Sequence, residues 1–203
     1  MIKVYCAALP EAPIGEPLGC EQRDRILRAL ANEDVQREKY YVWRLLEHAI
    51  YDAFGRRASD IDFSLDEKGV FWCKDLFFSL SHSKGALAVA VSDAPCGVDI
   101  ECIRPVPRAE KIAERVFSPS LRESLAECSD EEGRLLEFFR AWTLYEAEFK
   151  RNYTARGQGK ATQSFTDTLI FGEDTYTLSA VGEGECALNL TDIHKGGKNA
   201  GNN

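Results

Sequence analysis

Two kinds of hydrophobic spacing alternate along the chain, and they predict a mixture of helices and strands. Apolar side chains recur at helical spacing within 20–30 and again within 32–54, as on a helix with one buried face. The apolar positions of the second segment are Val35, Val42, Leu45, Leu46, Ala49 and Ile50. Asn32 is expected to cap this helix and Gly55 to end it.

Shorter apolar or alternating runs predict strands between and after these helices, because such runs fit a pleated surface with one or two buried faces. The predicted strands are 2–8, 61–65, 77–82, 86–91, 97–101, 166–171, 175–181 and 186–191. The chain therefore switches between helical and strand patterns in both of its halves.

The second half also carries helix start signals. Ser118 followed by Pro119 is a cap with proline in the first helical position. Ser129 and Glu132 have the spacing of a capping box, which predicts a helix running to about Asn152.

Helices followed by strands in each half predict an α/β (α+β) fold with two pseudo-symmetric lobes, each a small sheet packed on helices. The expected lobes are 1–96 and 97–194. The remaining segment, 195–203, is rich in glycine and asparagine and is predicted to be a disordered tail.

The composition narrows the class of protein. A formal charge of -8 argues against bulk nucleic-acid binding, although a local basic patch can still hold a phosphorylated small molecule. No apolar run has the length of a membrane span, and the first residues lack the pattern of a signal peptide. Seven cysteines without a Cys-x-x-Cys pair indicate reduced, buried thiols in a cytoplasmic protein.

The first candidate for chemistry is a pair of acids on a predicted strand. Asp99 and Glu101 are two residues apart, so they point to the same side of the strand, while Val98 and Ile100 face the other side. Adjacent carboxylates repel unless a proton or cation lies between them, and Mg²⁺ prefers such oxygen ligands. The alternative is a solvent-exposed strand face with two ordinary acids.

A second candidate lies on the helix predicted to follow. Trp142, Glu146 and Lys150 are spaced by four residues and share one helix face. They could supply a third metal ligand and a cation for phosphate. The alternative is a surface salt bridge beside a core tryptophan.

A third candidate is a polar turn. The segment 79–85 contains three serines, His82, Lys84 and a glycine, and such a turn could hold phosphate oxygens. The alternative is a polar hairpin with a surface histidine.

Taken in this order, these segments resemble the phosphopantetheinyl transferases, in particular the Sfp-like (surfactin-synthetase-activating) branch. The family pattern is Ser-His-Ser, then Gly-(Val/Ile)-Asp-(Val/Ile)-Glu, then Trp-x-x-Lys-Glu-x-x-x-Lys. The matching positions are Ser81 to Ser83, Gly97 to Glu101 and Trp142 to Lys150, with Phe117-Ser118 between the last two and a helix-borne Arg37 upstream. The resemblance covers about residues 30 to 155.

The resemblance implies an enzyme of the holo-[acyl-carrier-protein] synthase type. It would transfer the phosphopantetheine arm of coenzyme A to a serine of an apo acyl or peptidyl carrier protein, with Mg²⁺, and release 3',5'-adenosine bisphosphate. It would act as a monomer, a pseudo-dimer of two lobes. The implied metal ligands are Asp99, Glu101 and Glu146. The implied catalytic residues are Glu146 and Lys150, and the implied coenzyme contacts are Arg37, Ser81, His82, Ser83 and Lys150.

Two positions depart from the family pattern. Tyr145 stands where the family usually has a lysine before the metal glutamate, and Leu121 stands where a glutamate often follows the Phe-Ser pair. These departures leave open a homologue that binds coenzyme A or a carrier protein without turnover. A magnesium-dependent phosphohydrolase would share the carboxylates, but it would not explain the Ser-His-Ser segment or Arg37.

Overall fold

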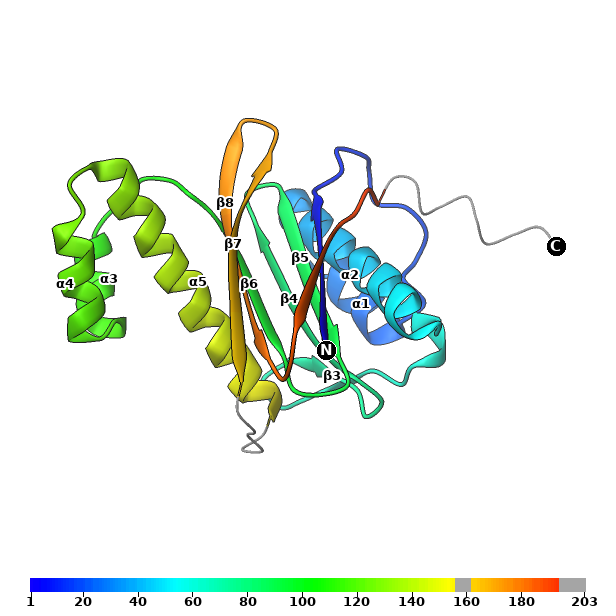
Figure 1. Cartoon of the computed structure of the whole chain (residues 1–203). Coiled ribbons are helices and arrows are strands. Elements are labelled where there is room, and N and C mark those ends of the chain that lie inside the picture. The colour runs from blue at the N-terminus through cyan, green and yellow to red at the C-terminus, as the bar shows by residue number, and fades with distance from the viewer. Residues whose placement is uncertain (156–161, 194–203) are drawn as a thin grey trace.

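The fold consists of two β-sheets stacked face to face, each covered on its outer side by one long helix (Figure 1). The computed structural model describes residues 1–155 and 162–193. Within these residues, no helix is both long enough and apolar enough to cross a membrane. The mixed α+β class predicted from the sequence is confirmed.

Each half of the chain begins with one strand, continues with helices and ends with further strands. The first half contains β1 (Ile2–Ala8), α1 (Glu21–Arg28), α2 (Glu33–Phe54), η1 (Ala58–Asp60), β2 (Ser64–Leu65), β3 (Phe71–Trp72), β4 (Phe77–Ser83) and β5 (Ala86–Ser92). The second half contains β6 (Gly97–Cys102), α3 (Ala109–Val116), α4 (Pro119–Glu127), α5 (Glu131–Ala155), β7 (Gln163–Phe171), β8 (Asp174–Gly182) and β9 (Cys186–Leu190).

One sheet has the strand order β4-β5-β1-β9 and the other β6-β8-β7, while β2 and β3 form a separate hairpin. All neighbours are antiparallel except β1 and β9, which are parallel. The last strand therefore returns to the sheet built by the first half, across the predicted lobe boundary at residue 96. The division into lobes stays a prediction, and the predicted tail lies outside the described residues.

The alternation of side chains along the strands creates two cores. On β1, Tyr5 and Ala7 face α2, while Ile2, Val4 and Cys6 face the second sheet. On β5, the residues that face the second sheet are Ala86, Ala88 and Ala90. Because these side chains are small, the two sheets can approach closely at this point.

Most predicted helix ends are confirmed. The Asn32 side chain accepts a hydrogen bond from the Val35 N–H at 3.0 Å, Gly55 ends α2 with a φ of 65°, and Ser118 caps α4. The predicted capping box at Ser129 is wrong. Asp130 Oδ1 accepts from the Gly133 N–H at 2.7 Å instead, because a carboxylate is the stronger acceptor and lies one residue nearer to α5.

Two strand and helix predictions also need correction. The alternating segment 61–65 forms a strand only at Ser64–Leu65, since Ile61 and Phe63 turn into the core beneath α2. The helix α3 was not predicted from the sequence. It has eight residues, follows the prolines at 105 and 107, and begins at Arg108 with a φ of 67° and no side-chain cap.

Candidate active site

A ladder of serine hydroxyls joins β4 to β6, although these strands belong to different sheets. Ser79, Ser81 and Ser83 alternate along β4 and face β6, whose edge N–H groups have no strand partner on that side. The N–H groups of Val98, Ile100 and Cys102 donate to Ser79 Oγ (3.0 Å), Ser81 Oγ (3.3 Å) and Ser83 Oγ (3.2 Å), respectively. The serines thus satisfy buried donors that would otherwise be costly.

Two of these hydroxyls continue to the predicted metal ligands. Ser81 Oγ donates to Asp99 Oδ1 at 2.7 Å, and Ser83 Oγ donates to Glu101 Oε2 at 2.6 Å. The Ser-His-Ser and Asp-Ile-Glu segments therefore meet side by side. A direct contact of Ser81 and Ser83 with the coenzyme stays a prediction.

The helix α5 comes unusually close to β6 at Gly97. A Cβ atom at this position would lie 2.6 Å from the backbone nitrogen of Arg151, and closer still to the carbonyl oxygen of Ala147. Only glycine permits this approach, because both obstacles are helix backbone. The approach brings Glu146 and Lys150 of α5 alongside Asp99.

Lys150 binds the buried end of this site rather than projecting into solvent. Its Nζ donates to Asp99 Oδ1 at 2.7 Å, to Val98 O at 3.1 Å and to Leu80 O at 3.4 Å. Asp99 is 5% exposed. A buried carboxylate needs an oppositely charged partner, so Lys150 stabilises the ionised form of Asp99.

The three carboxylates influence one another. Burial raises the pKa of Glu101, Ser83 lowers it by its hydrogen bond, and the charge of Asp99 raises it further. Burial also raises the pKa of Glu146, with Asp99 as the second cause and Lys150 in opposition. Both glutamates thus lie within electrostatic range of Asp99, which costs free energy unless a cation joins them.

Within the part of the chain that the structure describes, Asp99 Oδ2 is buried and has no hydrogen-bond partner. An all-oxygen set with an unsatisfied buried acceptor suits a hard divalent cation. However, among residues 1–155 and 162–193 no three His, Cys, Asp or Glu side chains are already gathered as a metal site. The donor chemistry therefore fits Mg²⁺, while the assignment of the three ligands stays a prediction.

His82 lies on the opposite face of β4, toward α2. Its Nδ1 is 3.3 Å from Glu38 Oε2. Burial lowers the pKa of His82, Glu38 opposes this, and Lys39, Lys150 and Arg23 add to the lowering. The positive charges of Lys150, Lys39 and Arg23 therefore all act on His82.

Sequence reasoning missed Arg23 and Lys39. The Arg23 guanidinium stacks over the ring of Trp43 at 5.2 Å, and its Nη2 donates to the Lys39 carbonyl at 2.8 Å. Arg23 Nε is buried without a hydrogen-bond partner. A buried arginine in a helix of mixed charge gives no sequence signal that distinguishes it from surface arginines.

Arg37, the arginine predicted as a coenzyme contact, forms an ion pair with Asp34 at 3.3 Å. Its Nε is also buried without a partner. Its role toward the coenzyme stays a prediction.

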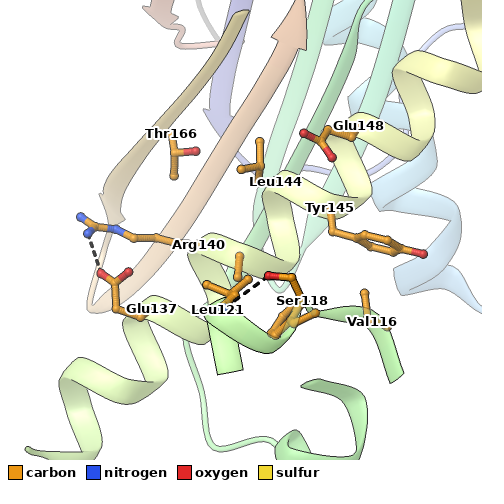
Figure 2. Close-up of a pocket in the computed structure, with 11 residues that line it drawn as sticks. Val116, Ser118, Leu121, Glu137, Arg140, Leu144, Tyr145, Glu148 and Thr166 are labelled. Atoms are coloured by element: carbon orange, nitrogen blue, oxygen red, sulfur yellow. Dashed lines mark hydrogen bonds and ion pairs between the residues drawn. The ribbon is translucent and has the colours of Figure 1, made fainter. Parts of the chain in front are cut away.

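The two departures from the family pattern line the same cavity. Leu121 and Tyr145, together with Phe117, Leu144 and Glu148, border a hollow of about 540 Å³ between the start of α4 and α5. Figure 2 shows the ring of Tyr145 extending away from the α5 ribbon. Tyr145 is a neighbour of Glu146 in sequence, but it points to a different side of α5, since successive helical residues differ by about 100°.

The sequence relationships agree with this geometry. The 4'-phosphopantetheinyl transferase superfamily matches residues 95–193, which contain β6, α5 and the three carboxylates. The 4'-phosphopantetheinyl transferase psf-1 of Bacillus pumilus is 34% identical over 128 residues, which are 62% of this chain and 53% of that protein. The chain therefore spans about half the length of this relative.

Two further relatives cover different parts of the chain. The 4'-phosphopantetheinyl transferase Sfp of Bacillus subtilis (strain 168) is 28% identical over 177 residues, 86% of this chain and 71% of that protein. The transferase AcpT of Salmonella typhi is 36% identical over 119 residues, 58% of this chain and 56% of that protein. The chain is thus similar to 4'-phosphopantetheinyl transferases, so the resemblance seen in its motifs is confirmed.

Proposed function

We propose that this protein is an Sfp-like transferase that moves the phosphopantetheine arm of coenzyme A to a serine of an apo acyl or peptidyl carrier protein. The activity would be of the holo-[acyl-carrier-protein] synthase type and would release 3',5'-adenosine bisphosphate. The observation that carries the proposal is the close approach of α5 to β6 at Gly97, which places Lys150 on Asp99 and Glu146 within electrostatic range of it.

Asp99, Glu101 and Glu146 would hold Mg²⁺. When bound, the ion would neutralise charge on the diphosphate of coenzyme A as the phosphorus–oxygen bond breaks. Three features of these side chains support this assignment: the unpartnered Asp99 Oδ2, the oxygen-only donor set, and the raised pKa values of both glutamates.

The protein's own side chains would then position the coenzyme and neutralise the charge of its phosphates. Lys150 fixes Asp99 and contributes positive charge next to the diphosphate. Lys39 and Arg23 would supply positive charge near His82 on the α2 side of β4, which suits further phosphate oxygens, and the imidazole of His82 would supply a hydrogen bond. Arg37 would approach the nucleotide from α2.

Glu146 is the best candidate to accept the proton of the carrier serine. Within the described residues its carboxylate has no hydrogen bond, whereas Asp99 and Glu101 are each bound by a serine hydroxyl.

The alternative of a binding protein without turnover gains no support from the geometry. Tyr145 and Leu121, the departures that suggested it, border a cavity on another side of α5. They leave the three carboxylates and Lys150 unchanged.

The proposal is tested by measuring the intact mass of an apo carrier protein after incubation with this protein, coenzyme A and Mg²⁺. A gain of roughly 340 Da, prevented by chelator, is expected for attachment of the arm at serine. Asp99→Ala and Glu146→Ala should abolish the gain while the far-ultraviolet circular dichroism stays unchanged. No gain with acyl and peptidyl carriers alike would contradict the proposal.

A further inference from the structure

The hydroxyl protons of Ser81 and Ser83 are already used within the site. Each hydroxyl has one hydrogen, and it is donated to Asp99 Oδ1 in one case and to Glu101 Oε2 in the other. Each oxygen also accepts from a backbone N–H of β6. Phosphate oxygens can only accept hydrogen bonds, so neither serine has a hydrogen left to offer them.

We propose that Ser81 and Ser83 are positioning residues whose hydroxyls orient the carboxylates of Asp99 and Glu101 toward a metal ion, and that these hydroxyls do not donate to the coenzyme. The inference rests on the proposed function, because it takes the two carboxylates as metal ligands. It reassigns two residues whose position in the Ser-His-Ser motif suggests a phosphate contact.

The hydrogen bonds leave a defined atom for the cation on Asp99. Ser81 and Lys150 both donate to Oδ1, while Oδ2 is buried and unpartnered. On Glu101, Ser83 occupies only Oε2. Ligating carboxylates depend on such outer hydrogen bonds for their orientation.

The ladder also explains why the two motifs share a spacing of two residues. Side chains two apart on a strand lie on the same face. Serines at alternate positions of β4 therefore meet acids at alternate positions of β6, one pair for each step. Each hydroxyl is fixed at both ends, by an N–H that it accepts and a carboxylate to which it donates, so it cannot rotate away.

Ser79 provides a matched control within the same ladder. Its Oγ accepts from the Val98 N–H at 3.0 Å, as Ser81 and Ser83 accept from their own partners, but it makes no bond to a carboxylate. Ser79→Ala removes only the hydrogen bond from a backbone N–H of β6. Ser81→Ala and Ser83→Ala each remove this kind of bond and also the hydrogen bond to a carboxylate.

The experiment compares these three variants of the full chain by Mn²⁺ affinity from electron paramagnetic resonance, by coenzyme A affinity from calorimetry in chelator, and by thermal unfolding. All three variants should unfold at a lower temperature. Ser81→Ala and Ser83→Ala should lose Mn²⁺ affinity by about 10-fold or more, the effect typical of removing an outer partner of a metal ligand. Ser79→Ala should retain Mn²⁺ affinity, and metal-free coenzyme A affinity should be unchanged throughout.

Two results would overturn the inference while leaving the transferase intact. One is a loss of metal-free coenzyme A affinity in Ser81→Ala or Ser83→Ala with Mn²⁺ affinity unchanged, which would make the serines coenzyme contacts. The other is an equal loss of Mn²⁺ affinity in Ser79→Ala, which would make the ladder merely structural. Absence of Mn²⁺ binding by the unaltered protein would overturn the metal assignment and this inference together.

The test does not depend on every variant folding. Ser83 is the last residue of β4, so Ser83→Ala is the milder change and carries the test if Ser81→Ala unfolds. Ser83→Thr keeps the hydroxyl and should restore Mn²⁺ affinity relative to Ser83→Ala. Failure of threonine to restore it in a folded protein would count against the inference.

Discussion

Gly97→Ala tests the close approach of α5 to β6. The added Cβ would lie 2.6 Å from Arg151 N, whereas an ordinary contact is 3.4 Å or more, so the helix backbone must move by at least about 0.8 Å. The bond from Lys150 Nζ to Asp99 Oδ1, now 2.7 Å, would lengthen to about 3.5 Å and no longer be a good hydrogen bond. Glu146 would shift with the same helix.

The expected cost of Gly97→Ala is about 1–3 kcal/mol of folding free energy from overpacking. In a chain of this length that lowers the melting temperature by roughly 2 to 12 °C. Transfer activity should fall by about 100-fold, since a misplacement near 1 Å has this effect on catalysis. The assays are scanning calorimetry and the rate of mass gain of an apo carrier protein, both with Mg²⁺ present.

Gly133→Ala is the matched control on the same helix. A Cβ there would lie 3.1 Å from the Asp130 carboxylate, so the variant would disturb the cap at the start of α5, far along the helix from Gly97, and no backbone atom is among its nearest neighbours. Alanine favours helix over glycine by about 1 kcal/mol, and a weakened cap costs about the same, so this variant should be close to the original protein in stability and fully active. A Gly97→Ala variant as stable and active as Gly133→Ala would refute the reasoning.

Three further variants test separate parts of the site. Lys150→Met should lower the free energy of unfolding by about 3 kcal/mol in chelator, because it leaves the buried Asp99 carboxylate without its cation. The control Lys84→Met breaks an exposed ion pair and should leave urea unfolding unchanged. Equal effects of the two variants would argue against a special role for Lys150. Tyr145→Lys should keep the transfer rate within about threefold, because Tyr145 borders a cavity on another side of α5 from the carboxylates. A severe loss of activity in a folded variant would show that the tyrosine has a role of its own. Burial lowers the pKa of His82, so its contribution to stability is present above the unfolded value of about 6.5 and is lost as the pH falls through the lowered value. His82→Gln should therefore flatten the acid limb of the unfolding midpoint measured against pH, and an unaltered limb would contradict this.

The elements that the sequence predicted well are those whose signals are local. The cap at Asn32, the stop at Gly55 and the alternation of β4, β5 and β6 all depend on neighbours within a few residues. The amphipathic helix α3 was not predicted, because its N-cap residue, Arg108, has a left-handed backbone conformation and no side-chain cap. Nothing in the sequence there resembles an ordinary helix start.

The metal-ligand candidates could be predicted because spacing places them on shared faces, yet their partners could not. The pairing of Ser83 with Glu101 joins residues 18 apart in sequence on strands of different sheets. Gly97 gave no sign of its role, since only the position of α5 makes its missing side chain necessary. Arg23 lies among other charged residues, and its burial against Trp43 arises from tertiary packing.

The parallel pairing of β1 with β9 constrains the order in which the polypeptide can fold during synthesis. Ile2 is the partner of Cys186, so one edge of β1 stays unpaired until residue 186 has left the ribosome. Contacts between such distant segments form late and expose an unpaired edge until they do. A fragment that stops before residue 186 would carry every proposed catalytic group and still leave β1 without this neighbour. Expression of separate lobes should therefore give aggregation-prone products, and any truncation meant to retain the fold should keep the segment through Leu190.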